Sequence, residues 1–323
     1  MIPGFEAVFP HVRGILPSFS YLCSRFQTLI MPGQLKEVRN RIKSIQSTQQ
    51  ITKAMKMISA TKLRKAQDAI IQMRPFNRKL QQILSHIVSD ADVNMGYGLT
   101  IERPIEKVLL IVITSDRASC GAYNSALIKL AKSTIREKYS AQAAKGNVMI
   151  WSIGKKGYEH FLKNGFKVAD TYKDLLQNIK FENVQACAQA AVWAFIDHKF
   201  DTIEIVYSEF KNAATQRYTV EKFLPVVKIE TKGKTRRADF IFDPPKEELM
   251  QELIPVILNT QLYKAVLDSN ASEHGARMTA MDKATENANE ILKSLRISYN
   301  RARQAAITTE LNEIVSGAAA LQA

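Results

Sequence analysis

Apolar side chains recur every three or four positions along a segment that begins at Leu35. This spacing is typical of a helix that buries one stripe in a coiled coil. The positions that follow it are Leu35, Val38, Ile42, Ile45, Gln49, Thr52, Lys56, Ser59, Leu63, Ala66, Ile70 and Met73. Eight of these twelve are apolar, and the four polar ones are consecutive. The pattern predicts one long helix over residues 33–89, with an interruption in the middle of its apolar stripe.

The segment that spans this interruption is apolar on nearly every side. Residues 51–60 read Ile-Thr-Lys-Ala-Met-Lys-Met-Ile-Ser-Ala. A helix that is apolar around much of its circumference needs protein around much of its circumference. We therefore expect this segment to be enclosed by protein.

A second stripe with the same period lies near the C-terminus. Its members are Met278, Met281, Thr285, Ala288, Leu292, Leu295, Tyr299, Ala302 and Ala306, and it moves to another face at Ile307, Leu311, Ile314, Ala318 and Leu321. The helix predicted here begins at Lys246, and Pro255 is tolerable near its first turns or as a kink. Two such helices at opposite ends of a chain can bury their stripes against each other only as an antiparallel pair. The heptad spacing predicts a left-handed coil.

The middle of the chain has a different period. We expect strands at 108–113, 148–153, 202–207 and 218–226, and helices at 125–138, 155–163 and 184–198. The first strand is a continuous apolar run, as in a parallel strand buried on both faces. The last two strands are expected to pair as a hairpin. This alternation predicts an open α/β sheet of Rossmann type. The predicted fold is thus a long antiparallel coiled coil of N- and C-terminal helices plus a central Rossmann-like α/β domain as its foot.

Residues 1–30 differ from the rest, because they contain prolines and glycines, few charges and no lasting period. We interpret them as an extension upstream of a natural start at Met31, with a targeting peptide as the alternative. The predicted organisation is an extension at 1–30, a coiled-coil helix at 31–90, an α/β domain at 91–245 and a second coiled-coil helix at 246–323.

The chain of 323 residues has a formal net charge of +14, and the position of this charge is informative. Residues 33–89 hold twelve Lys and Arg against two Asp and Glu, whereas residues 246–323 hold eight against ten. The first helix is therefore strongly basic, and acidic partners are expected: nucleic acid, an anionic membrane or an acidic protein surface. Three widely spaced cysteines predict no disulfide framework, which suits a reducing compartment.

Motifs that bind phosphate are broken or weak. The nearest sequence to a phosphate-binding loop, Gly233-Lys-Thr, lacks the glycine five positions earlier, where Lys228 stands. The turn Gly154-Lys-Lys-Gly157 follows a strand and opens a helix, but an ordinary strand-to-helix turn is the better interpretation of it.

Candidate catalytic residues are equally sparse. Cys120, in the segment 114–124, stands where a nucleophile could lie. The preferred interpretation has Asp116 or Ser119 capping a helix and Gly121 easing the turn. The histidines are scattered and lack metal-ligand spacing. We predict no catalytic, cofactor-binding or metal site.

Four segments together resemble the gamma subunit of F-type ATP synthases. They are residues 51–67, which begin Ile-Thr-Lys-Ala-Met, the turn 114–124, residues 273–281 (Glu-His-Gly-Ala-Arg-Met-Thr-Ala-Met) and residues 307–320, which begin Ile-Thr-Thr-Glu and end Gly-Ala-Ala-Ala. The match runs in order from Met31 to the end, resembles bacterial members, and lacks the thiol insertion of the chloroplast branch.

The resemblance implies a non-catalytic rotor. In the family the coiled coil stands inside a ring of alternating alpha and beta subunits, and the α/β foot rests with the epsilon subunit on the membrane c-ring. Proton flow through the c-ring is coupled by rotation to ATP synthesis on the beta subunits. The basic helix would face acidic loops of the beta subunits, and the tail 314–323 would turn in an apolar collar. The implied location is peripheral to the bacterial inner membrane on its cytoplasmic side, or alternatively the matrix side of the mitochondrial inner membrane.

The resemblance also implies rotor residues that contact a beta subunit. They are Met55, Lys56, Arg303, Gln304, Thr308 and Glu310. For Met55 the alternative is a place in the coiled-coil seam, and for Arg303 a solvated charge on a helix face. No cofactor is implied.

Two other classes of protein compete with this interpretation. A basic coiled-coil protein could bind nucleic acid through residues 36–79, but nucleic acid would not cover the apolar side chains at 51–60. A Rossmann enzyme with helical arms would need the glycine fingerprint that is missing after every predicted strand.

Overall fold

The computed structural model describes residues 33–88, 98–99, 103–213, 215–226 and 246–322. It divides into two compact units. The larger unit covers residues 50–286, and the smaller unit combines the segment up to Gln49 with the segment from Asn287 onward. The extension predicted at 1–30 and the loop Gly233-Lys-Thr lie outside the described residues.

A five-stranded sheet of order β3-β2-β1-β4-β5 forms the centre of the larger unit. The strands are β1 (Val108–Ile113), β2 (Val148–Ile153), β3 (Lys167–Ala169), β4 (Thr202–Phe210) and β5 (Gln216–Leu224). The first four are mutually parallel, and Val108 of β1 pairs with Val148 on one side and Thr202 on the other. The strand β5 runs antiparallel to β4, which confirms the predicted hairpin.

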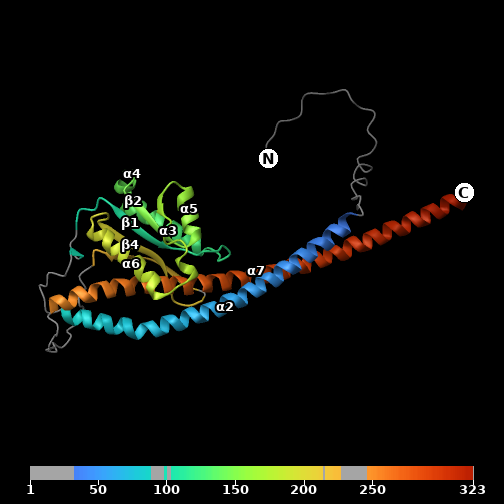
Figure 1. Cartoon of the computed structure of the whole chain (residues 1–323). Coiled ribbons are helices and arrows are strands. Elements are labelled where there is room, and N and C mark those ends of the chain that lie inside the picture. The colour runs from blue at the N-terminus through green and yellow to red at the C-terminus, as the bar shows by residue number, and fades with distance from the viewer. Residues whose placement is uncertain (1–32, 89–97, 100–102, 214, 227–245, 323) are drawn as a thin grey trace, which may run out of the picture. The chain divides into compact units, whose positions relative to one another are not determined.

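Helices cover both faces of this sheet (Figure 1). They are α3 (Tyr123–Lys138), α4 (Ser140–Ala144), α5 (Lys155–Lys163), the short 3-10 helix η2 (Leu175–Gln177), α6 (Phe181–Ile196) and the first part of α7 (Lys246–Gln322). Side chains of α3 and α5 pack on one face, and side chains of α6 and α7 pack on the other. The predicted Rossmann-like α/β domain is therefore confirmed.

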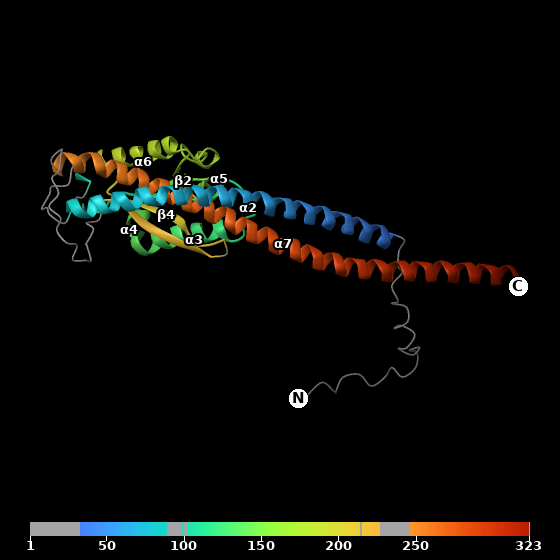
Figure 2. The same cartoon turned by 90° about the horizontal axis from the view of Figure 1, so that it is seen from below.

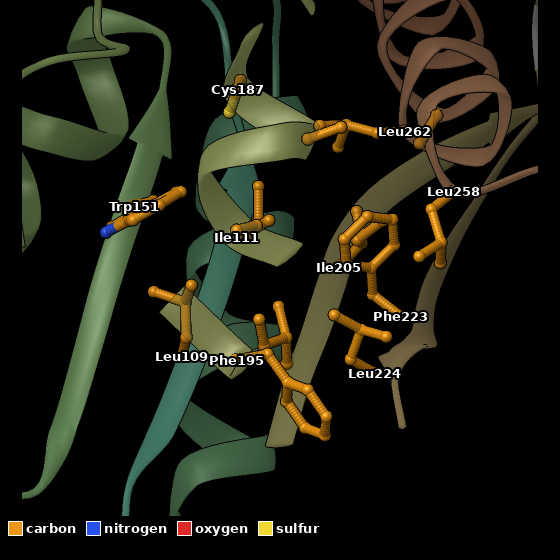
Figure 3. Packing of buried hydrophobic residues seen from close by; sticks show 14 of the residues in the cluster. Leu109, Ile111, Trp151, Cys187, Phe195, Ile205, Phe223, Leu224, Leu258 and Leu262 are labelled. Carbon is orange, nitrogen blue, oxygen red and sulfur yellow. The ribbon is translucent and has the colours of Figure 1, made fainter. Parts of the chain in front are cut away.

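The strand β1 is buried on both faces because its side chains alternate between two cores. Leu109, Ile111 and Ile113 join the core under α6 and α7 (Figure 3). Val108 and Leu110 join the core under α3 and α5. A fully buried Leu, Ile or Val contributes about 1.5–3 kcal/mol relative to an exposed position. The unbroken apolar run thus holds the two helical layers on one sheet.

Two long helices, α2 (Gly33–Val88) and α7, carry the predicted coiled coil. Both continue through their internal prolines, Pro75 and Pro255. In the larger unit α2 lies beside α7 (Figure 2) and packs on it through Leu63, Ala66 and Ala271. In the smaller unit the buried residues of α7 include Ala288 and Leu292, both members of the predicted stripe.

The four consecutive polar positions of the first stripe interrupt its apolar character and still face the partner helix or the interior. In the smaller unit Gln49 donates a hydrogen bond to Asn289. In the larger unit the hydroxyls of Thr52 and Thr285 are 2.8 Å apart, and Ser59 is buried with its hydroxyl donating to a carbonyl of its own helix. The interruption is thus a polar layer in the helix interface.

Helix α3 begins differently from the prediction. Its N-cap is Ala122, with no capping side chain, so neither Asp116 nor Ser119 caps it. Asp116 lies six residues earlier and instead accepts a 3.3 Å hydrogen bond from the backbone N–H of Lys155, in the first turn of α5. Ser119 has a positive φ of 69°, and the positive φ of 60° at Gly121 confirms the turn expected there.

Candidate functional site

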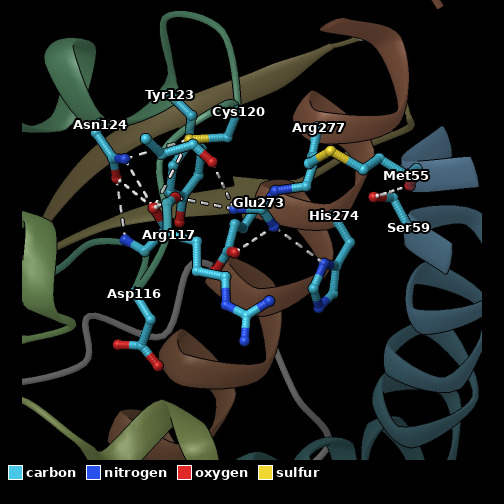
Figure 4. Close-up of polar contacts among 12 residues, drawn as sticks. Met55, Ser59, Asp116, Arg117, Cys120, Tyr123, Asn124, Glu273, His274 and Arg277 are labelled. Atoms are coloured by element: carbon cyan, nitrogen blue, oxygen red, sulfur yellow. Dashed lines mark hydrogen bonds and ion pairs between the residues drawn. The ribbon is translucent and has the colours of Figure 1, made fainter. Parts of the chain in front are cut away.

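The segment 114–124 folds into a closed network of polar side chains (Figure 4). Asn124 accepts a 3.0 Å hydrogen bond from the backbone N–H of Ser115 and donates to the Ser115 hydroxyl at 2.7 Å and the Cys120 sulfur at 3.2 Å. The Ser115 hydroxyl donates to the carbonyl of Arg117 at 2.7 Å. Cys120 is only 2% exposed, so its thiol closes this turn and is inaccessible as a nucleophile.

A buried ion pair of α7 meets this turn. Arg277 donates to Glu273, one helical turn earlier, at 2.5 Å, and both side chains are 9% exposed. The same guanidinium donates to the carbonyl of Arg117 at 3.0 Å, and Tyr123 donates to the carbonyl of Ser269 at 3.0 Å. Removing one member of such a buried pair is costly because the other charge is left uncompensated. These contacts fix α7 to the α/β domain, and together they are called the joint below.

Charge crowding perturbs the groups beside this pair. Burial raises the pKa of Glu273, and the neighbouring Arg277 opposes that rise. Burial, Arg277 and Lys62 of α2 together lower the pKa of His274 to about 4. His274 is therefore neutral near pH 7. The joint thus combines groups from α2, α7 and the 114–124 turn, three segments that are far apart in the sequence.

The Gly154–Gly157 turn is filled by the protein itself. The backbone N–H groups of Lys156 and Gly157 donate to the carbonyl of Ser115 at 3.1 Å and the hydroxyl of Thr114 at 2.9 Å, and that of Lys155 donates to Asp116. A Cβ at Gly154 would lie 2.5 Å from the carbonyl oxygen of Thr114. The ordinary strand-to-helix turn is therefore confirmed, and these N–H groups are not available to an anion.

The described part of the chain offers little redox or metal chemistry. No group of three or more His, Cys, Asp or Glu side chains among the described residues could hold a metal ion. Cys120 and Cys187 are free and buried, and burial raises the pKa of the Cys187 thiol to about 12. None of the described helices is both long enough and apolar enough to cross a membrane.

Helix α2 carries an apolar surface around the predicted contact residues Met55 and Lys56. Ile51, Met57 and Ile58 are 57%, 60% and 58% exposed. Met55 is half-buried, and Lys56 forms a 2.5 Å ion pair with Asp282 of α7. We expected protein to enclose this segment. Helix α7 covers one side of it, and the apolar side chains on the other sides are exposed to solvent.

The other four predicted contact residues lie near the end of α7, in the smaller unit. Arg303, Gln304, Thr308 and Glu310 are all exposed. The Thr308 hydroxyl donates to the carbonyl of Gln304 at 2.9 Å. Tyr299, Ala302 and Ala306 are half-buried, so Arg303 and Gln304 stand off the seam, as predicted.

One contact in the smaller unit was not expected from the sequence. Arg39 of α2 donates a 3.1 Å hydrogen bond to the hydroxyl of Tyr299, and its guanidinium lies 5.9 Å from the ring centroid. This bond and the positive charge lower the pKa of Tyr299. The sequence does place a Tyr on the α7 stripe and an Arg next to the α2 stripe, and these two positions were the only hint that such a contact could form.

The last turns of α7 display apolar side chains without cover. Ile307, Leu311, Ile314, Val315 and Leu321 are between 49% and 90% exposed. Contiguous exposed apolar side chains mark interaction surfaces. With the surface around Ile58, this gives two apolar contact surfaces, one in each unit.

Comparisons with known proteins identify the family of this chain. A family model described as ATP synthase matches residues 34–321. The ATP synthase gamma chain of Cytophaga hutchinsonii is 49% identical over 294 residues, which is 90% of this chain and 99% of that one. The gamma chains of Flavobacterium johnsoniae and Chlorobaculum tepidum are 48% and 44% identical, over 90% and 89% of this chain and 99% of each relative. The chain belongs to the ATP synthase gamma chain family.

Solved structures show the same fold in distant proteins. A chain of the Euglena gracilis mitochondrial ATP synthase, from a structure of its OSCP, F1 and c-ring, is 20% identical with a TM-score of 0.61, covering 90% of this chain and 95% of that one. A chain from the central stalk and c-ring of the Tetrahymena thermophila mitochondrial ATP synthase is 22% identical with a TM-score of 0.51, covering 72% and 99%. The curated relatives named above are gamma chains, which favours the family interpretation over nucleic-acid binding.

Proposed function

We propose that this chain is the central rotor subunit of an F-type ATP synthase. It couples proton flow through a membrane c-ring to ATP synthesis in a ring of alpha and beta subunits by rotating inside that ring. Family membership is the observation that carries the proposal. The exposed apolar side chains of α2 and of the end of α7 support it, because such surfaces need partner protein.

The domains divide the work. The coil that α2 forms with the C-terminal part of α7 is the part inside the ring, and the α/β domain, with the first part of α7 packed on its sheet, rests with the epsilon subunit on the c-ring. Catalysis belongs to the beta subunits, so this chain is a non-catalytic subunit without a cofactor. The gamma chain relatives are bacterial, which supports a peripheral place on the cytoplasmic side of the bacterial inner membrane.

The rotor contacts beta subunits at two places. Met55 and Lys56 lie beside the exposed apolar side chains Ile51, Met57 and Ile58. Arg303, Gln304, Thr308 and Glu310 lie on exposed turns of α7. A guanidinium forms a planar fork that suits a carboxylate or a pair of carbonyls. Arg303 is therefore the strongest candidate for a contact made with one beta subunit at a time.

Lys56 has a partner within the chain besides the proposed contact with a beta subunit. It already pairs with Asp282 at 2.5 Å, and both side chains remain over 40% exposed. An exposed pair of this kind contributes little to stability. Its ammonium can therefore contact a beta carboxylate while it keeps Asp282 as a neighbour.

The mechanism is mechanical linkage. An asymmetric rotor contacts each catalytic subunit differently, and it shifts each between open and closed states only by its differential interaction with them. Each charge that crosses the membrane supplies about 2.3 kcal/mol per 100 mV. The buried Glu273–Arg277 pair, bonded to the carbonyl of Arg117, holds α7 on the α/β domain that receives this torque.

Co-expression with the alpha and beta subunits of the same organism tests the proposal. We expect the chain to co-purify with an alpha–beta hexamer, and a bead attached to its α/β domain to rotate when ATP is hydrolysed. A chain that folds and leaves ATP hydrolysis by the hexamer unchanged would contradict the rotor role. A chain carrying Leu292→Asp, which places a carboxylate at a buried coil position, serves as the control for loss of the coil.

A further inference from the structure

Helices α3 and α5 leave an open groove between them on the α/β domain, on the face of the sheet opposite to α6 and α7. Its volume is about 610 Å³, within the usual range of ligand-binding clefts. The charged and titratable side chains that line it are Lys129, Lys132, Arg136, Glu137, Lys156 and His160. The groove is therefore strongly basic, with a single carboxylate in its lining.

Most of this charge is not neutralised by the described part of the chain. Lys156 pairs with Glu159 at 2.6 Å. None of the ion pairs among the described residues involves Lys129, Lys132 or Arg136. These three therefore present positive charge to whatever enters the groove.

One end of the groove holds a hydrogen bond between Lys132 and His160, and Lys132 also donates to the side-chain oxygen of Asn164 at 3.5 Å. The ammonium of Lys132 lies 2.9 Å from Nε2 of His160. Burial, Lys132 and Lys163 together lower the pKa of His160. A carboxylate placed beside Lys132 would offset the charge of its ammonium and raise the pKa of His160. His160 thus reports on occupation of the groove.

The geometry of the cations limits the occupant. Lys129, Lys132 and Arg136 follow one another at helical spacing on one face of α3, over about 10 Å at 1.5 Å rise per residue. A partner helix with carboxylates on successive turns has the same repeat. Ile128 lines the floor of the groove and is 8% exposed, and the aliphatic stems of the lysines add apolar surface between the charges. Apart from the His160 ring the groove lining has no aromatic side chain, so bases of nucleic acid would lack their stacking platform.

We propose that the groove between α3 and α5 is a docking site for an acidic amphipathic helix of a partner protein, whose carboxylates pair with Lys129, Lys132 and Arg136. This site goes beyond the rotor function, and its binding can be tested on the free chain without the ring or the membrane. Failure of the rotor proposal would leave it standing.

A synthetic peptide tests the proposal on the full-length chain. The probe is a fluorescein-labelled helix with Glu on successive turns and Leu between them, and binding is followed by anisotropy at low and high salt. We expect saturable binding that weakens with salt. The double variant Lys132→Gln with Arg136→Gln should bind about tenfold more weakly, because it loses two ion pairs that are each weak at an exposed site.

Matched variants distinguish binding in the groove from nonspecific attraction to the positive charge of the protein. Lys180→Gln with Lys199→Gln removes the same charge from exposed positions outside the groove and should bind like the wild type. Lys132→Arg keeps the cation and should also bind. In NMR titrations the pKa of His160 should rise when the peptide is bound. Unchanged melting temperatures would show that every variant is folded.

Several results would overturn the proposal. They are equal binding of a peptide with Gln in place of Glu, equal loss in both double variants, and a His160 pKa that the peptide does not move. Vesicles of phosphatidylglycerol or inorganic pyrophosphate could instead bind in a manner that requires Lys132 and Arg136, while the peptide does not. That outcome would mean that the groove binds a phosphate group and not an acidic helix.

Discussion

At the scale of single residues, the pair Arg303 and Gln304 should matter for turnover more than for folding. Both side chains are exposed and off the seam, and the small residues Ala305 and Ala306 follow them, which allows another chain to approach closely. Losing one charge-assisted hydrogen bond costs roughly 1.5–3 kcal/mol, or about one to two decades in an equilibrium. Arg303→Ala with Gln304→Ala should assemble normally and turn over slowly in the reconstituted complex.

The melting temperature of the same complex separates this contact role from a structural one. Wild-type turnover in the double variant would place the beta contact elsewhere on α7. A collapsed melting temperature would mean that Arg303 stabilises the coil. Arg303→Lys keeps the charge but loses the planar fork, and it should show an intermediate turnover.

Buried Asp268 and half-buried His274, both in the larger unit, should shape the pH dependence of stability. Burial, reinforced by Glu209 and Glu221 and opposed by Lys264 and Arg74, raises the pKa of Asp268 to about 6. The folded chain therefore binds more protons there than the unfolded chain between about pH 4 and 6, and the unfolding free energy falls as pH rises through that window.

His274 has the opposite effect. Its pKa is lowered from an ordinary 6.5 to about 4, so the folded chain binds fewer protons there and stability rises with pH over nearly the same window. The two contributions oppose each other in the wild type.

Asp268→Asn should leave the His274 contribution alone. The quantity to follow is the unfolding free energy of the variant minus that of the wild type. As pH rises from about 4 to 6, this difference should grow by up to about 2–3 kcal/mol, because only the wild type loses the Asp268 contribution. Denaturant unfolding at a series of pH values measures it. A difference that does not change with pH would mean that Asp268 is not the group that titrates.

At the scale of elements, the joint between α7 and the α/β domain contains one buried ion pair, Glu273–Arg277. Glu273→Gln leaves the Arg277 guanidinium, which is bonded to the carbonyl of Arg117, without its counter-charge. We expect a loss of about 3 kcal/mol in unfolding free energy, measured by denaturant titration of the free chain. Glu159→Gln, which breaks an exposed ion pair of the same domain with Lys156, should change it by less than about 1 kcal/mol.

An equal loss in the two variants would contradict the special role of the joint.

The complex assembled from Glu273→Gln should also lose coupling, seen as ATP hydrolysis with less proton pumping. Its hydrolysis alone should persist, because the beta subunits carry the chemistry.

At the scale of the whole molecule, α2 and α7 should turn as one body. In the larger unit the side chains of Thr52 and Thr285 face each other with their hydroxyls 2.8 Å apart, so a cysteine at each position places two sulfur atoms within reach of each other. Thr52→Cys with Thr285→Cys should oxidise to a cross-link, and the oxidised complex should rotate and turn over like the reduced one.

Single Cys variants treated with the same oxidant are the controls. Turnover that stops on oxidation and returns on reduction would mean that the two helices slide past each other in each step. That result would contradict a rotor that transmits torque as a rigid coil.

The elements that could be read from the sequence are those with local pattern. The stripe through Leu63 and Ala66 packs as predicted, and the apolar run of β1 lies in the middle of the sheet with both faces covered. In each case the periodicity of the helix or strand fixes which side chains are buried, and no distant residue is needed to decide it. The strand β3 (Lys167–Ala169) was missed because three residues cannot show a period.

What the tertiary structure decided is the pairing of polar groups. The sequence marks Gln49, Thr52, Lys56 and Ser59 as a gap in the apolar stripe, and only the packing of α7 supplies Asn289, Thr285 and Asp282 as partners for three of them. Asp116 resembles a cap for α3, but it bonds the first turn of α5.

The same holds for the joint and for the basic groove. Arg277 and the carbonyl of Arg117 are 160 residues apart in the chain, and Lys132 meets His160 only because α3 and α5 share one face of the sheet. Apolar burial depends on one side chain and the face it lies on, so a local pattern encodes it. A hydrogen bond or ion pair depends on the position of two specific atoms, and only the folded chain brings those together.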